Sequence, residues 1–231
     1  MIKSYSDFIT ALLDAGFSMG GGNNDGIYSI IPWNWNEEPP YETPVRWHTG
    51  NIETDPWEWR IRVLDERDDI AYGKLFFKKS GYITKDWYPY FLAVRRGVST
   101  FAQTYNDGKI SHYAKRIYEV VEPGSSLPLE EIKHLGRFGK EDKSKFNAAI
   151  TELQMKLYLA MCGSRNKRNA KGEEYGWAST VFCRAEDFWG SNVFETAASI
   201  DSGKAVHKIR EQILRFNPLA AEKKISKFIT G

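Results

Sequence analysis

Cysteine is scarce in this sequence, and long hydrophobic runs are absent from it. The 231 residues include only Cys162 and Cys183, too few for a disulfide scaffold or a cysteine-based metal site. No apolar run approaches the roughly 20 residues that cross a bilayer. The opening residues, MIKSYSD, carry an aspartate where a signal peptide would have its basic region. We therefore expect a cytoplasmic protein with two reduced thiols and no membrane partner.

The residue patterns of several enzyme classes are also missing. The four histidines are scattered and show no His-x-x-Glu spacing, and no Cys-x-x-Cys pair or Gly-x-Ser-x-Gly turn occurs. The glycine-rich run at residues 19–26 is not followed by the Gly-Lys-Ser/Thr of a phosphate-binding loop, so we interpret it as a turn. The sequence predicts no metal site and no cofactor.

Charge is present in both signs but is unevenly distributed. Residues 1–100 carry 11 Lys/Arg and 14 Asp/Glu, whereas residues 101–231 carry 21 and 16. Residues 137–172 include nine basic residues and only three acidic ones. A basic half beside a slightly acidic half indicates a polyanionic partner, with the binding surface in the second half of the chain.

Helical periodicity marks two segments of the second half. In each, apolar residues recur at 0, 4, 7 and 11 and so fall on one helix face: Ile110, Ala114, Ile117 and Val121 in the first, Phe146, Ile150, Leu153 and Leu157 in the second. A short helix is predicted between them at residues 128–135. Two strands, 157–162 and 177–183, should follow around a polar tip. This order is that of a winged-helix module, expected at about residues 110–189.

The first half is rich in aromatic residues, with six of the eight tryptophans between positions 33 and 87. Trp33 and Trp35, like Trp57 and Trp59, are two residues apart, which predicts strands that present each pair on one face. The rings form either the core of a small domain or a platform that stacks an unpaired base or a sugar.

We therefore predict an α+β protein in which a C-terminal winged helix-turn-helix packs against an aromatic-rich α+β N-terminal domain. The expected divisions are a Trp-rich domain at 1–106, the winged helix at 107–190 and a helical extension at 191–231.

The candidate nucleic-acid contacts lie on the second long helix and on the hairpin tip. Cations and amides at the tip would donate hydrogen bonds to phosphate oxygens and release counterions. At the start of the helix, Lys143 and Ser144 suit the phosphate backbone, and Lys145 and Asn147 suit base edges. The predicted tip contacts are Arg165, Asn166, Lys167, Arg168 and Lys171.

Five short segments carry a resemblance to a known family. They are TDPWEWR at 54–60, YGKLF at 72–76, YPYF at 88–91, LQMKL at 153–157 and YGWAS at 175–179. In this order they resemble bacterial AlkZ-related proteins, over about residues 5–189. The wider group includes the AlkZ-type DNA glycosylases, winged-helix enzymes that release alkylated bases and interstrand crosslinks. The resemblance implies a winged-helix scaffold that binds DNA.

The catalytic pattern of those glycosylases is incomplete here. They are similar to one another in a Gln–aliphatic–Gln/Asp pattern that positions the attacking water. The three glutamines of this chain, Gln103, Gln154 and Gln212, do not complete it. Asp55 or Glu58 would have to orient the water instead.

Three functional interpretations follow. The sequence favours a duplex DNA-binding protein whose catalytic site is degenerate or altered. One alternative is a repair glycosylase that acts on a flipped alkylated base through Asp55 or Glu58. The other is a winged helix that contacts only protein.

Overall fold

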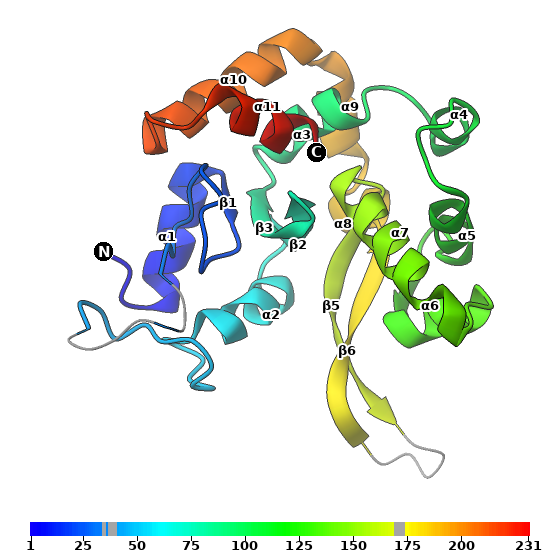
Figure 1. The fold of residues 1–231 in the computed structure, drawn as a ribbon, viewed down its shortest axis with the longest axis horizontal. Helices are drawn as coiled ribbons and strands as arrows, with labels where there is room; N and C mark the ends of the chain where they lie inside the picture. The colour runs from blue at the N-terminus through cyan, green and yellow to red at the C-terminus, as the bar shows by residue number, and fades with distance from the viewer. Residues whose placement is uncertain (34–35, 37–40, 169–173) are drawn as a thin grey trace.

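The computed structural model describes residues 1–33, 36, 41–168 and 174–231, and shows a mixed α and β chain with two small antiparallel sheets (Figure 1). The expectation of an α+β fold with antiparallel strands is thereby confirmed. None of the described helices is long and apolar enough to span a membrane.

The first sheet is built around a hairpin in the N-terminal half. Its strands are β1 (Phe17–Met19), β2 (Ile70–Phe76) and β3 (Lys79–Thr84), in the order β1-β3-β2. Three helices pack around them: α1 (Tyr5–Ala15), α2 (Pro56–Glu66) and α3 (Tyr88–Arg95). Gly16, at φ 80°, ends α1 in the left-handed conformation and lets the chain turn directly into β1.

The second sheet and its helices follow. The helices are α4 (Phe101–Asn106), α5 (His112–Val120), α6 (Leu129–Leu135) and α7 (Lys143–Met155), with a short 3-10 turn, η1 (Lys140–Asp142), before α7. The strands are β4 (Ser126–Pro128), β5 (Leu159–Arg168) and β6 (Glu174–Arg184), in the order β4-β6-β5. The predicted succession of helix, short helix, longer helix and hairpin is therefore present as α5, α6, α7 and β5–β6.

Four further helices complete the chain. They are α8 (Ala185–Trp189), α9 (Ser191–Ser199), α10 (Ser202–Phe216) and α11 (Glu222–Thr230). Helix α10 packs against α3, and α11 contacts both (Figure 1). The part of the chain expected to be a helical extension, residues 191–231, thus contains α9, α10 and α11.

Two clusters of buried side chains form the core, and each draws on distant parts of the sequence. The first joins α1 and α2 to α5, α7 and the hairpin, with Trp59 stacked on Phe8 at a ring-centroid distance of 5.1 Å. The second joins the first sheet and α3 to α9, α10 and α11, with Phe76 stacked on Phe228 at 3.9 Å. The division of the chain at residues 106 and 190 stays a prediction.

The structure corrects the expected strand at Trp57 and Trp59. These residues lie in α2, where Asp55 is the N-cap and Pro56 opens the first turn. Both residues are typical helix-start signals, and they outweigh the two-residue tryptophan spacing. Consequently Trp59 is fully buried, whereas Trp57 points elsewhere and is 39% exposed. Trp35 lies outside the described residues.

A partly buried arginine ties the end of α3 to three other segments. The Arg95 guanidinium donates hydrogen bonds to the carbonyls of Leu75, Met155, Phe228 and Ile229, at 2.7, 3.0, 2.6 and 2.9 Å. Burial lowers the pKa of Arg95 to about 9, which is still above neutral pH, so the side chain is charged when it makes these bonds. Arg95 thus connects β2, α7 and α11.

Candidate nucleic-acid interface

Helix α7 buries one face and exposes another. Phe146, Ala149, Ile150 and Leu153 are buried against the first core cluster, because they recur at helical spacing. The four predicted contact residues of this helix, Lys143, Ser144, Lys145 and Asn147, are all exposed.

These four residues do not share one direction. The Lys145 ammonium lies 5.3 Å from the centre of the Tyr113 ring, on the side of α5. The Tyr113 hydroxyl donates to Asp142 at 2.8 Å, and this hydrogen bond lowers the pKa of the Asp142 carboxyl. Asn147 instead lines a cavity on the opposite side, toward β2. The helix therefore divides its polar residues between two surfaces.

The β5–β6 hairpin is longer than predicted and projects away from α10 and α11 (Figure 1). The strands pair from Leu159 and Arg184 to Arg168 and Glu174. Arg165 is half exposed and lies 3.8 Å from the Glu131 carboxylate of α6, a distance that leaves it able to change partner. Asn166 is exposed.

The outer part of the predicted tip is only partly described. Lys167 and Arg168 belong to β5, where they pair in register with Tyr175 and Glu174. Their side chains lie outside the described part of the structure, as does the whole of Lys171.

Asp55 occupies a structural position at the start of α2. Its carboxylate is fully buried and accepts four backbone N–H groups, from His48 at 3.0 Å, Thr49 at 2.7 Å, Gly50 at 2.9 Å and Trp57 at 2.8 Å. Each oxygen receives two of these bonds. A carboxylate so saturated has little capacity to orient a water molecule.

Glu58 lies one turn further, in the first turn of α2, and is half-buried. It lines none of the three cavities described next, although its helix neighbours Trp57 and Arg60 do.

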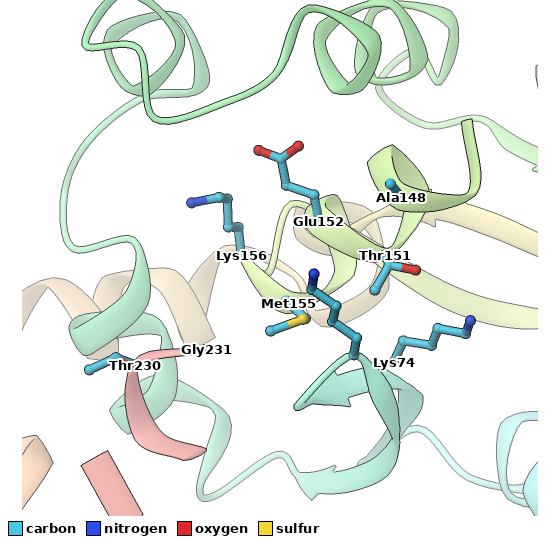
Figure 2. A pocket seen from close by; sticks show the side chains of 9 residues that line it. Lys74, Ala148, Thr151, Glu152, Met155, Lys156, Thr230 and Gly231 are labelled. Atoms are coloured by element: carbon cyan, nitrogen blue, oxygen red, sulfur yellow. The ribbon is translucent and has the colours of Figure 1, made fainter. Parts of the chain in front are cut away.

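Three neighbouring cavities meet at Lys74, the one exposed residue of β2. The first, of about 420 Å³, lies between β2 and the C-terminal half of α7, where Thr151 and Met155 form part of its wall (Figure 2). The second, of about 360 Å³, lies against α2 and is lined by Trp57, Arg60 and Lys78. The third, of about 340 Å³, lies among β2, α7 and the hairpin, and Arg60 and Asn147 line it.

Gln154 fixes the wall between β2 and α7. It is 2% exposed, its side-chain oxygen accepts the Lys74 backbone N–H at 3.0 Å, and its side-chain nitrogen donates to the Ile150 carbonyl at 3.1 Å. Both ends of the amide are therefore occupied within the protein.

Sequence reasoning missed the basic residues of these cavities, Arg60, Lys74 and Lys78. Two signals point to them once α2 is recognised as a helix. Trp57 and Arg60 are three residues apart and so share a helix face, and Lys74 interrupts a strand that is otherwise buried. No group of three or more metal-ligating side chains occurs among the described residues.

No curated protein and no solved structure matches the chain. The family model described as AlkZ related matches residues 2–230, which is nearly the whole length. The chain therefore belongs to the AlkZ-related family.

Proposed function

We propose that this protein binds duplex DNA through a winged-helix module made of α5, α6, α7 and the β5–β6 hairpin. The observation that carries the proposal is the exposure of basic and amide side chains on two parts of the module, the start of α7 and the hairpin. The order of the elements and the family relationship support it.

The proposed contacts follow the geometry of α7. Lys143 and Ser144, exposed in its first turn, contact the phosphate backbone. Lys145, which lies toward α5, contacts a phosphate on that flank. Asn147 is the residue we assign to a base edge, because an amide can pair with adenine. Arg165 and the rest of the hairpin contact the backbone beyond the groove.

We further propose that the glycosylase chemistry of AlkZ-type enzymes is degenerate or altered in this chain. All three glutamines serve the fold. Gln103 completes the capping box of α4, Gln154 links β2 to α7, and Gln212 donates to the Ala15 carbonyl at 2.8 Å. The Asp55 carboxylate is occupied by backbone N–H groups. These contacts favour DNA binding over hydrolysis of a glycosidic bond.

The test is a fluorescence-anisotropy titration onto a labelled random-sequence duplex at several salt concentrations. The variant replaces Arg165, Lys167 and Arg168 with glutamate. The matched control replaces Lys3, Lys204 and Lys223, exposed lysines outside the module, with the same net charge change. We expect affinity to fall with salt, and the log–log salt slope to become shallower by about 2.7 in the hairpin variant if all three cations contact phosphates.

A folded wild-type protein that fails to bind at low salt would refute the proposal. So would an equal loss of affinity in the two triple variants, because the effect would then depend on net charge alone. A screen against alkylated duplexes follows only if the hairpin variant is the weaker binder.

A further inference from the structure

We infer that the cleft formed by the second and third cavities holds one unpaired nucleotide, with its base on the Arg60 guanidinium and its phosphate at Lys74 and Lys78. The inference deepens the proposed function and rests on it, because α7 borders this cleft through Asn147. It assigns the cleft a ligand of a definite class, a nucleotide outside the double helix.

Arg60 is held as a flat platform. Its guanidinium carbon lies 3.5 Å from the centre of the Trp57 ring, and its Nε donates to the Trp57 carbonyl at 2.7 Å. Arg60 lines both cavities, so this fixed cation is presented to the cleft. Guanidinium planes stack on unpaired bases as aromatic rings do, and the stacking surface costs little when it is already immobilised.

The charge of the lining suits a phosphate. The two cavities bring together Arg60, Lys74, Lys78 and Lys79, and among the residues that the structure describes Asp25 is the single acidic one in their lining. Asp25 is neutralised by Lys79, whose ammonium lies 2.7 Å from its carboxylate. Within this described lining, the positive charges of Arg60, Lys74 and Lys78 are therefore left for a ligand. Because a neutral sugar would not use them, the cleft favours a nucleotide over a carbohydrate.

Size and polarity are consistent with one base and its sugar phosphate. The cavities measure about 360 and 340 Å³ and join along Arg60, Tyr72, Lys74 and Ser80, which line both. Volumes of this order are typical of small-molecule sites. The lining hydroxyl and amide groups that can read the edge of an unpaired base include Asn23, Ser80, Thr151 and Thr180.

The Lys74 position allows a clean variant. Its contribution to the fold is the backbone N–H that donates to Gln154, and a side-chain substitution leaves this bond in place. Arg60→Lys keeps the positive charge but removes the plane, so it separates stacking from attraction to phosphate. The control is Lys204→Gln, because Lys204 is exposed and lines none of the three cavities.

The experiment compares three labelled probes: a perfect duplex, the same duplex with a single-nucleotide bulge, and a ten-residue single strand. We expect wild type to bind the bulged duplex about tenfold more tightly than the perfect one, a gain of the size that stacking of one base contributes. Arg60→Lys and Lys74→Gln should each remove most of this ratio, and Lys204→Gln should preserve it. Circular dichroism of each variant verifies folding.

The outcomes separate the inference from the proposed function. Tight binding of the perfect duplex without preference for the bulge overturns the inference and leaves duplex binding intact. A preference that survives Arg60→Lys and Lys74→Gln also overturns it. Binding of the bulged duplex and the single strand, lost in both cleft variants, supports the cleft even if the perfect duplex does not bind.

Discussion

Replacement of Asp55 by alanine should destabilise the protein strongly, because one buried carboxylate organises both a loop and a helix start. The four N–H groups that it accepts come from the loop at residues 48–50 and from the first turn of α2. If the same carboxylate were a catalytic group free to bind water, its removal would abolish activity and spare the fold.

The magnitude follows from the four bonds. Hydrogen bonds to a charged group contribute about 1.5–3 kcal/mol each. Their sum over four bonds is an upper limit, and the net loss of unfolding free energy is well below it. Residues 48–50 are exposed, so their N–H groups regain bonds to water in the variant. We therefore expect a loss of about 2–4 kcal/mol for Asp55→Ala, more than an ordinary N-cap contributes because three further N–H groups lose a charged acceptor. In a chain of this size, at about 2–4 °C per kcal/mol, that is a fall of roughly 4–16 °C in Tm.

The assay is urea unfolding monitored by tryptophan fluorescence, which Trp59 reports because it is fully buried. Asp201→Ala is the matched control. Asp201 is also an N-cap, but it is exposed and accepts one N–H, from Lys204 at 2.9 Å. Its loss should cost only about 1 kcal/mol. Equal destabilisation in the two variants would refute the structural role that we assign to Asp55.

Two further predictions concern titration and thiol chemistry. Burial raises the pKa of Tyr5 to about 12. Between pH 10 and 12 the unfolded chain therefore loses the phenol proton while the folded chain keeps it. Because the unfolded chain then binds fewer protons, the free energy of unfolding falls as the pH rises through this range. Tyr5→Phe should reduce this fall by about 1 kcal/mol in urea unfolding at pH 11, and an unchanged profile would contradict the assignment. A hydrogen bond from Cys183 lowers the pKa of the half-buried Cys162 thiol, whereas donation of this bond and burial raise that of Cys183. A limiting amount of iodoacetamide should therefore alkylate Cys162 first, and Cys183→Ala should slow the alkylation of Cys162 several-fold. Peptide mass spectrometry measures both rates. Equal rates at the two thiols would contradict this prediction.

Local patterns in the sequence predicted most helices and strands of the second half. The 0, 4, 7, 11 spacing located α5 and α7, and the short helix predicted at residues 128–135 is α6. The same spacing extended the predicted second helix too far, to Leu157. Leu157 is buried, but it adopts a left-handed conformation at φ 60° between α7 and β5. Burial alone therefore did not fix where the helix ends.

The first half was harder to predict, because two signals conflicted there. Trp57 and Trp59 have strand spacing, but Asp55 and Pro56 start a helix, and capping prevailed. Strand β1 is only three residues long, and its partner β3 lies more than 60 residues away, so no local pattern reveals it.

The cleft could not be found from local patterns either. The bond between Lys74 and Gln154 spans 80 residues, and Arg60 joins them only through packing of α2. The candidate contacts on α7 were predicted as a group, yet the structure turns Lys145 and Asn147 to opposite sides. Composition indicates that basic residues gather in the second half, whereas tertiary packing decides which surface each one joins.

The four carbonyls around Arg95 also set an order of events during synthesis. Phe228 and Ile229 follow Arg95 by 133 and 134 residues, so at 5–20 residues per second the arginine waits roughly 7–27 s for its last two acceptors. Until they arrive, closing the protein over Arg95 would bury a charge with half of its partners missing, at a cost of several kcal/mol. We therefore expect the junction of β2, α3 and α7 to stay hydrated while the ribosome makes the following helices. Docking of α11 supplies the last two acceptors, so the packing around Arg95 is complete only when the C-terminal helix is in place.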